Sequence, residues 1–146
     1  MMAPTPPTVD PNAQLYRFKL AKLIRDHIPQ RMEREDVVLS YRTLEAAAYR
    51  AALQAKFEEE VREVDQAEQA PEILEELADV CELIHAYARA HGLSMDQVEE
   101  RRQTKRALMG GFERQLYGEY VQLTAQNPKL GYYKNRPDHY AQLPLE

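Results

Sequence analysis

Two pairs of acidic residues interrupt the apolar faces of two predicted helices. At about 100° of rotation per residue, Glu60 falls within an apolar stripe and Glu63 borders the same face one turn later. Glu76 and Asp79 repeat this i, i+3 spacing on the next helix. The two stripes consist of Leu53, Phe57, Val61 and Val64, and of Ile73, Leu77, Val80, Leu83, Ile84 and Tyr87. Each helix therefore carries an acidic pair on the face that it would bury.

A divalent cation would account for these carboxylates. An uncompensated buried carboxylate costs several kcal/mol, and crowding raises carboxyl pKa values until some groups are neutral unless a cation offsets the charge. Oxygen ligands without a matching His or Cys set favour Mg²⁺ or Mn²⁺ over Zn²⁺. Because Mg²⁺ commonly binds through carboxylates together with substrate phosphates, this ligand set indicates a phosphorylated substrate.

A purely structural interpretation of the acidic pairs stays open. Among 24 acidic residues, i, i+3 pairs also arise by chance in a helical protein. They would then solvate a helix face or pair with Arg62 and Lys56.

Two long helices are predicted to carry the acidic pairs. Thr43 is a suitable N-cap for a helix over residues 44–67, which contains neither Gly nor Pro. The second helix opens at Pro71 and closes at Gly92, which can take the left-handed conformation. Cys81 lies in an apolar run of this second helix and is expected in the core. These two helices predict an all-α fold.

Shorter elements flank the two long helices. Ser94 and Gln97 form a capping box for a third helix, which ends at Gly110 and Gly111. Pro29 favours a short helix through Glu35. The remaining predictions are an extended segment over residues 37–41, a disordered leader over the proline-rich residues 1–13, and a tail with several tyrosines but no sustained helical periodicity.

Composition narrows the function classes. The chain has 146 residues, enough for one domain. Its 19 basic and 24 acidic side chains do not favour nucleic-acid binding. No apolar run reaches the length of a membrane span and the first residues do not resemble a signal peptide, so a cytoplasmic protein without membrane contact is expected. A single cysteine excludes an intrachain disulfide.

Three segments resemble a known superfamily. Glu59-Glu60-Val61-Arg62-Glu63, followed after twelve residues by Glu76-Leu77-Ala78-Asp79, resembles the EExxE…ExxD signature of the MazG-like all-α NTP pyrophosphohydrolases. LAKLIRDHIP, residues 20–29, is similar to the KLVRDKIP opening of a house-cleaning branch of that superfamily. KRALMGGF, residues 105–112, is similar to its KxxxRGGF close. The resemblance covers residues 19–115.

The resemblance implies a site and a reaction. Glu60, Glu63, Glu76 and Asp79 would be the Mg²⁺ ligands, and Glu59 would bind a second ion or orient the attacking water, so that Glu59 and Glu60 are the expected catalytic pair. The products of hydrolysis between the α and β phosphates would be a nucleoside monophosphate and pyrophosphate. The triphosphate would contact four basic residues, Lys22, Arg25, Lys105 and Arg106.

The sequence departs from the family pattern at three places. His27 replaces a Lys, Met109 replaces the Arg before the glycines, and the tail beyond Tyr117 is longer than usual. Because Met109 cannot bind a phosphate, Arg106 would take over that role. Residues 14–115 are the expected catalytic domain and residues 116–146 its Tyr-rich extension, where tyrosines would stack on a base or form an interface.

The resemblance also implies an assembly, and alternatives remain. The expected fold is a MazG-like bundle completed by homo-oligomerisation, as a homodimer or a dimer of dimers, with sites near the subunit interface. Within the enzyme class, the alternative is a phosphoribosyl-ATP pyrophosphohydrolase of histidine biosynthesis. Outside that class, it is a non-catalytic helical module that binds nucleotide or Mg²⁺, or a dimerisation protein with structural acidic pairs.

Overall fold

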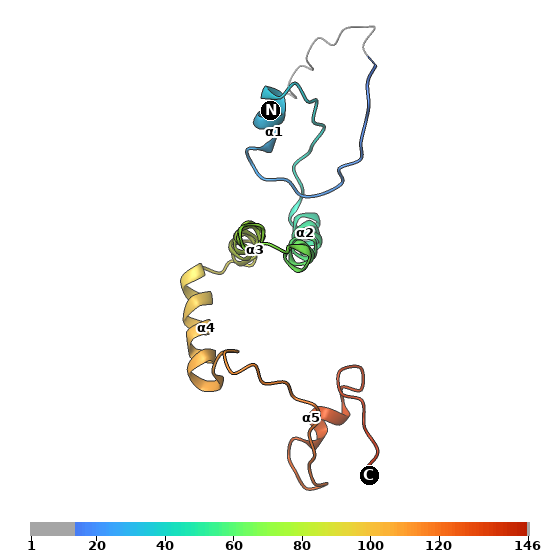
Figure 1. Ribbon diagram of the computed structural model, residues 1–146, viewed down its shortest axis with the longest axis vertical. Coiled ribbons are helices and arrows are strands. Elements are labelled where there is room, and N and C mark those ends of the chain that lie inside the picture. Colours follow the sequence, from blue (N-terminus) through green and yellow to red (C-terminus); the bar gives the residue numbers. More distant parts are fainter. Residues whose placement is uncertain (1–13, 146) are drawn as a thin grey trace. The chain divides into compact units, whose positions relative to one another are not determined.

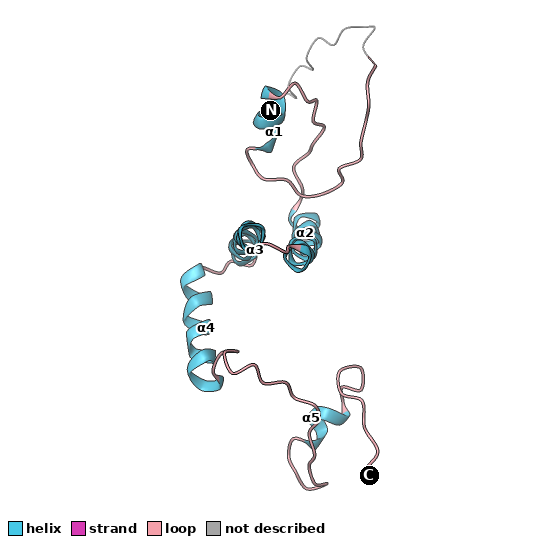
Figure 2. Cartoon of the chain, viewed as in Figure 1, coloured by secondary structure: helices cyan, strands magenta, loops and turns pink. Residues whose placement is uncertain are grey.

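The computed structural model describes residues 14–145, and the predicted disordered leader lies outside this range. Helices are the regular elements of the described chain, which contains no strand, so the all-α prediction is confirmed (Figure 1; Figure 2). The helices are α1 (Ile28–Arg34), α2 (Ala46–Gln66), α3 (Ala70–Ala90), α4 (Met95–Met109) and α5 (Leu130–Lys134). None of these helices has the length and hydrophobicity needed to span a bilayer.

The described chain divides into two compact units, one ending at Lys105 and the other beginning at Arg106. The first contains α1, α2, α3 and most of α4, and the second contains the last residues of α4 and all of α5. The expected catalytic domain over residues 14–115 and its extension stay predictions.

A hairpin of α2 and α3 forms the core of the first unit. The two helices pack side by side after a connection of three residues, 67–69 (Figure 1). Leu53 of α2 is only 1% exposed, and Leu83 of α3 is also buried. The edge of the Phe57 ring meets the Tyr87 ring with centroids 5.9 Å apart, a favoured aromatic geometry. This packed face fixes the register in which the two acidic pairs meet.

The ends of α3 follow the sequence signals. Gln69 and Glu72 form a capping box, and Pro71 lies in the first turn. Gly92 has a φ of +70°, and the Leu93 N–H donates to the Ala88 carbonyl at 2.8 Å, which closes the helix in the left-handed manner predicted. The predicted bounds of this helix are therefore confirmed to within one or two residues.

The predicted capping box of α4 is also confirmed. The Ser94 N–H donates to Oε1 of Gln97 at 2.8 Å, and the Gln97 N–H donates to Oγ of Ser94 at 3.2 Å. Gly110, with a φ of +81°, ends the helix. The short helix predicted from Pro29 is present as α1, with the proline in its first turn.

One local prediction was wrong, one stays open, and one short helix was not predicted. Thr43 does not cap α2: the N-cap is Glu45, which has extended backbone and no side-chain capping bond, while Leu44 is half-buried in irregular chain. Residues 37–41 form neither a helix nor a strand, and their extended backbone stays a prediction. The five-residue α5 was not predicted, because one helical turn of Leu130–Lys134 carries no measurable periodicity.

Burial differs from the helical-wheel prediction on the outer faces. Cys81 is exposed rather than buried, and Val61 and Leu77, assigned to the apolar stripes, are each 47% exposed. Leu74 is exposed as well. In a two-helix hairpin each helix is covered on one face only. The apolar face of α3 is wider than the surface that α2 covers, so its outer residues stay exposed.

Candidate active site

The α2–α3 hairpin brings the predicted carboxylates together. One oxygen each from Glu59, Glu60 and Glu63 lies within 4.8 Å of the other two, and the same holds for Glu60, Glu76 and Asp79. Glu60 belongs to both groups. The two acidic pairs, which are far apart on an extended chain, thus form one cluster on the packed helices, here called the carboxylate cluster.

Glu60 is the buried centre of the carboxylate cluster. It is 4% exposed, the only buried charged residue in the described chain. Its Oε1 pairs with Lys56 of the preceding turn, whereas its Oε2 is buried without any hydrogen-bond donor among residues 14–145. An unsatisfied carboxylate oxygen of this kind is costly. A cation held between Glu60 and its acidic neighbours would satisfy it, so the residues present fit a divalent ion.

The segment before α1 supplies two further cations. Lys22 contacts Oε1 of Glu59 at 2.7 Å, and Arg25 pairs with Asp79. Ala21 has a φ of +46°, in the left-handed region that non-glycine residues seldom occupy, directly before Lys22. The N-terminal segment therefore lies against the carboxylate cluster, where both basic residues had been predicted to bind a triphosphate.

The charges of the carboxylate cluster do not balance. Its five acidic side chains face three cations, Lys22, Arg25 and Lys56. With all groups ionised, the formal charge left over is −2, which one divalent cation would neutralise. This excess of negative charge distinguishes the carboxylate cluster from a surface network in which each carboxylate is paired with a cation.

The pKa directions reflect this crowding. The adjacent Glu60 carboxylate, which would accept a hydrogen bond from the protonated form of Glu63, raises the pKa of Glu63, and partial burial and the charges of Glu60, Glu76 and Glu59 add to the effect. The hydrogen bond from Lys22 lowers the pKa of Glu59 despite its partial burial. Burial disfavours the charged form of Lys56, but hydrogen bonds with Glu60 and Glu59 outweigh it and raise the pKa of the ammonium group.

Glu63→Gln is expected to stabilise the metal-free protein at neutral pH. A folded-state pKa above the usual 4.5 means that Glu63 contributes most to stability when it is protonated, and this contribution is lost as the pH rises through the folded-state pKa. The neutral amide avoids that loss, so the difference from wild type should vanish below pH 4.5. Urea unfolding of both proteins in EDTA across this pH range measures it. A variant less stable than wild type at neutral pH would contradict the assignment.

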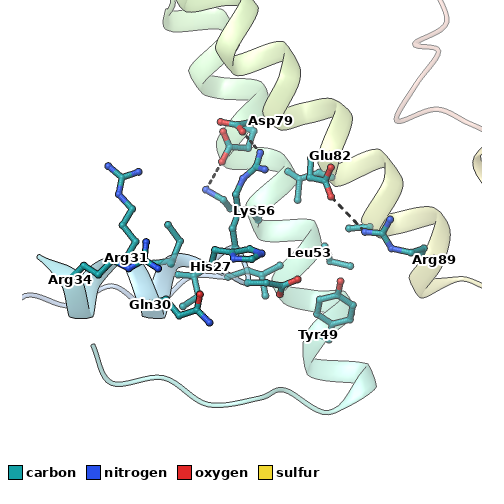
Figure 3. A pocket seen from close by; sticks show the side chains of 18 residues that line it. His27, Gln30, Arg31, Arg34, Tyr49, Leu53, Lys56, Asp79, Glu82 and Arg89 are labelled. Atoms are coloured by element: carbon teal, nitrogen blue, oxygen red, sulfur yellow. Dashed lines mark hydrogen bonds and ion pairs between the residues drawn. The ribbon is translucent and has the colours of Figure 1, made fainter. Parts of the chain in front are cut away.

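A cavity of about 700 Å³ adjoins the carboxylate cluster. Lys56 and Asp79 lie at one end of it, Arg31 and Arg34 project from α1, and Glu82 and Arg89 come from α3 (Figure 3). Leu53, Leu83 and Tyr49 add apolar and aromatic surface. Five basic and four acidic side chains line this space, so a small ligand with a ring and with phosphates, bound together with a divalent ion at the carboxylates, would suit it.

The remaining predicted phosphate contacts lie at the end of α4. Lys105 is exposed, and Arg106 forms an ion pair with Glu113 at 2.6 Å within the second unit. A Cβ on Gly111 would collide with the Arg106 guanidinium and the Glu113 carboxylate. The ion pair therefore occupies the space that a side chain at position 111 would need. A phosphate role for Lys105 and Arg106 stays a prediction.

Several lining residues were not predicted as site residues. Lys56 had been considered only as a structural partner, although its i, i+3 and i, i+4 spacing to Glu59 and Glu60 is the signal that would have found it. Arg62, the other structural partner considered, forms no ion pair within residues 14–145. Arg31, Arg34 and Arg89 carry no local signal, because the tertiary arrangement alone brings them to the cavity.

Comparisons with protein-family models, with curated proteins and with solved structures find no match for this chain.

Proposed function

We propose that this chain is a Mg²⁺-dependent nucleoside triphosphate pyrophosphohydrolase. The observation that carries the proposal is the convergence of five carboxylates around buried Glu60, whose Oε2 has no hydrogen-bond donor in the described chain. All potential ligands are carboxylate oxygens, which favour Mg²⁺ or Mn²⁺. The resemblance of the three sequence segments to MazG-like enzymes supports the same function independently of the geometry.

Different residues of the site would bind the metal ion, the attacking water and the triphosphate. Glu60, Glu63, Glu76 and Asp79 would hold the ion, and Glu59 would bind a second ion or orient the attacking water. When bound, Mg²⁺ would neutralise charge on the phosphates and lower the pKa of water. Lys22 and Arg25, already next to the carboxylates, would donate hydrogen bonds to the triphosphate.

The adjoining cavity would receive the substrate. Its volume of about 700 Å³ lies in the roughly 300–1,000 Å³ range of small-molecule sites. Asp79 and Lys56 at one end would face the phosphates, and the half-buried Tyr49 ring would contact the nucleoside. The products would be a nucleoside monophosphate and pyrophosphate.

Within this class we favour house-cleaning of non-canonical nucleotides. The support is the opening segment over residues 20–29, whose Lys22 and Arg25 contact the carboxylate cluster. In a phosphoribosyl-ATP pyrophosphohydrolase such an opening is not expected.

The proposal includes a bundle completed by a second copy. Leu74, Leu77 and Cys81 leave an apolar strip of α3 exposed, and apolar strips of this kind commonly mark an interface. Sedimentation velocity is expected to give a dimer or a dimer of dimers. A monomer at assay concentrations would contradict this part.

The test of the function is pyrophosphate release from a substrate panel. The purified chain would be incubated with canonical NTPs and dNTPs, dUTP, dCTP, 8-oxo-dGTP and phosphoribosyl-ATP, with Mg²⁺ and with EDTA. Mg²⁺-dependent formation of monophosphate and pyrophosphate is expected, with a modified or non-canonical nucleotide preferred. Preference for phosphoribosyl-ATP would favour the biosynthetic alternative, and a folded protein that releases no pyrophosphate from any substrate would contradict the enzyme proposal.

A further inference from the structure

Lys56 occupies the junction between the carboxylate cluster and two cavities. Its side chain is 19% exposed and comes from the middle of α2. The Nζ atom lies 3.1 Å from Oε1 of Glu59 and pairs with Oε1 of Glu60. Lys56 lines both the cavity of about 700 Å³ and a second one of about 570 Å³. Among the three cations at the cluster it is the least exposed.

The pairing of Lys56 with Glu60 has a physical cause. A carboxylate as buried as Glu60 is strongly destabilising unless a cation compensates it, and Lys56 is the cation in contact with it. A divalent ion bound to the same carboxylate would take over this compensation. The ammonium of Lys56 would then keep its contact with Glu59 at most, and its other N–H donors would be left without a partner beside the cavity.

A phosphate oxygen is the partner that suits a displaced lysine here. Lysine has three N–H donors on a flexible stem, so Nζ can leave the carboxylates without a change in the helix. The cavity that it lines is lined by five cations, Arg25, Arg31, Arg34, Lys56 and Arg89, and by four carboxylates, Asp26, Glu60, Asp79 and Glu82. Once a divalent ion neutralises Glu60 and Asp79, the cations would be in excess and would attract an anion. An incoming polyphosphate would thus find Lys56 close to the metal ligands Glu60 and Asp79.

We propose that Lys56 is the counter-ion of Glu60 in the metal-free chain and becomes a phosphate-binding residue for the substrate once a divalent cation occupies the carboxylate cluster. This inference rests on the proposed function and extends it to a residue outside the acidic signature. It assigns Lys56 a direct contact with the polyphosphate, whereas a structural lysine would keep its contact with Glu60 in both states.

The first test compares Lys56→Met with Arg62→Gln, which removes one positive charge from the same helix outside both cavities. Calorimetry would measure Mn²⁺ binding alone and then inorganic pyrophosphate binding in saturating Mg²⁺. Without its competing ammonium, Lys56→Met should bind Mn²⁺ more tightly and pyrophosphate about tenfold more weakly. Arg62→Gln should match wild type in both.

The outcomes separate the two proposals. If wild type binds the metal and turns over substrate while Lys56→Met binds pyrophosphate as tightly as wild type, the inference about Lys56 is overturned and the proposed function stands. If wild type binds no divalent cation, the proposed function is overturned, and the inference falls with it.

A second measurement covers the case in which Lys56→Met folds poorly. In EDTA this variant should unfold at lower urea concentration than wild type, since Glu60 has lost its counter-ion, and Mg²⁺ should remove most of the difference. The double variant Lys56→Met with Glu60→Gln should regain stability in EDTA, because no buried charge remains. Equal destabilisation of Lys56→Met with and without Mg²⁺ would overturn the counter-ion exchange.

Discussion

Glu60→Gln is expected to lower Mg²⁺-dependent pyrophosphate release by at least about 100-fold. Loss of a group that merely supports a metal ligand costs roughly 10–100-fold, and Glu60 contributes to both oxygen groups of the carboxylate cluster. The neutral amide supplies a weaker ligand and reduces the charge that attracts the ion. Asp79→Asn should act in the same direction.

The stability of Glu60→Gln separates a lost ligand from a lost fold. In EDTA the variant should be as stable as wild type or more stable, because a buried anion without a donor for Oε2 is replaced by an amide that can donate to its acidic neighbours. Glu58→Gln is the matched control, since Glu58 neighbours the cluster in sequence but accepts its hydrogen bond from Gln54. Full activity of Glu60→Gln would contradict the assignment of Glu60 as a metal ligand.

Leu53→Ala is expected to cost about 2–5 kcal/mol of unfolding free energy, the range for truncation of a buried leucine. Leu53 is 1% exposed and is the largest fully buried side chain described. It packs in the α2–α3 hairpin, whose register brings the acidic pairs together, so metal affinity should fall as well.

Urea unfolding of Leu53→Ala measures this loss, with Leu116→Ala as the control. Leu116 is 74% exposed, and its truncation should change the free energy by less than about 0.5 kcal/mol. Equal effects of the two substitutions would show that the hairpin is not held together by its buried leucines.

The ends of the helices were predicted well where a glycine or a capping residue determines the backbone conformation. Gly92 and Gly110 end α3 and α4 because both adopt positive φ, and the Ser94–Gln97 capping box starts α4 as expected. The beginning of α2 was missed, since residues 43–45 are compatible with a helix and Leu44 instead lines a cavity. That choice is made by tertiary packing, which a single sequence does not display.

The carboxylates of the site were predictable from the sequence, whereas the cavity walls depend on tertiary packing and were not. Periodicity placed Glu60 and Glu76 within the apolar faces of two helices and Asp79 at the edge of the second face, and packing of those faces brings these residues together. The cavity walls were not predictable, because Arg31 and Arg89 are far apart in sequence and on different helices. Exposure of Cys81 was missed because helical periodicity shows which face is apolar and not whether another element covers it.

Direct titration of the purified chain with Mn²⁺, followed by competition with Mg²⁺, tests the central claim most directly, since every proposed role depends on a divalent ion at the carboxylate cluster. Calorimetry should show saturable Mn²⁺ binding that Mg²⁺ displaces, retained in Glu58→Gln and lost or greatly weakened in Glu60→Gln. Wild type and Glu60→Gln with the same weak, unsaturable response would contradict a metal site and leave the acidic pairs with a structural role.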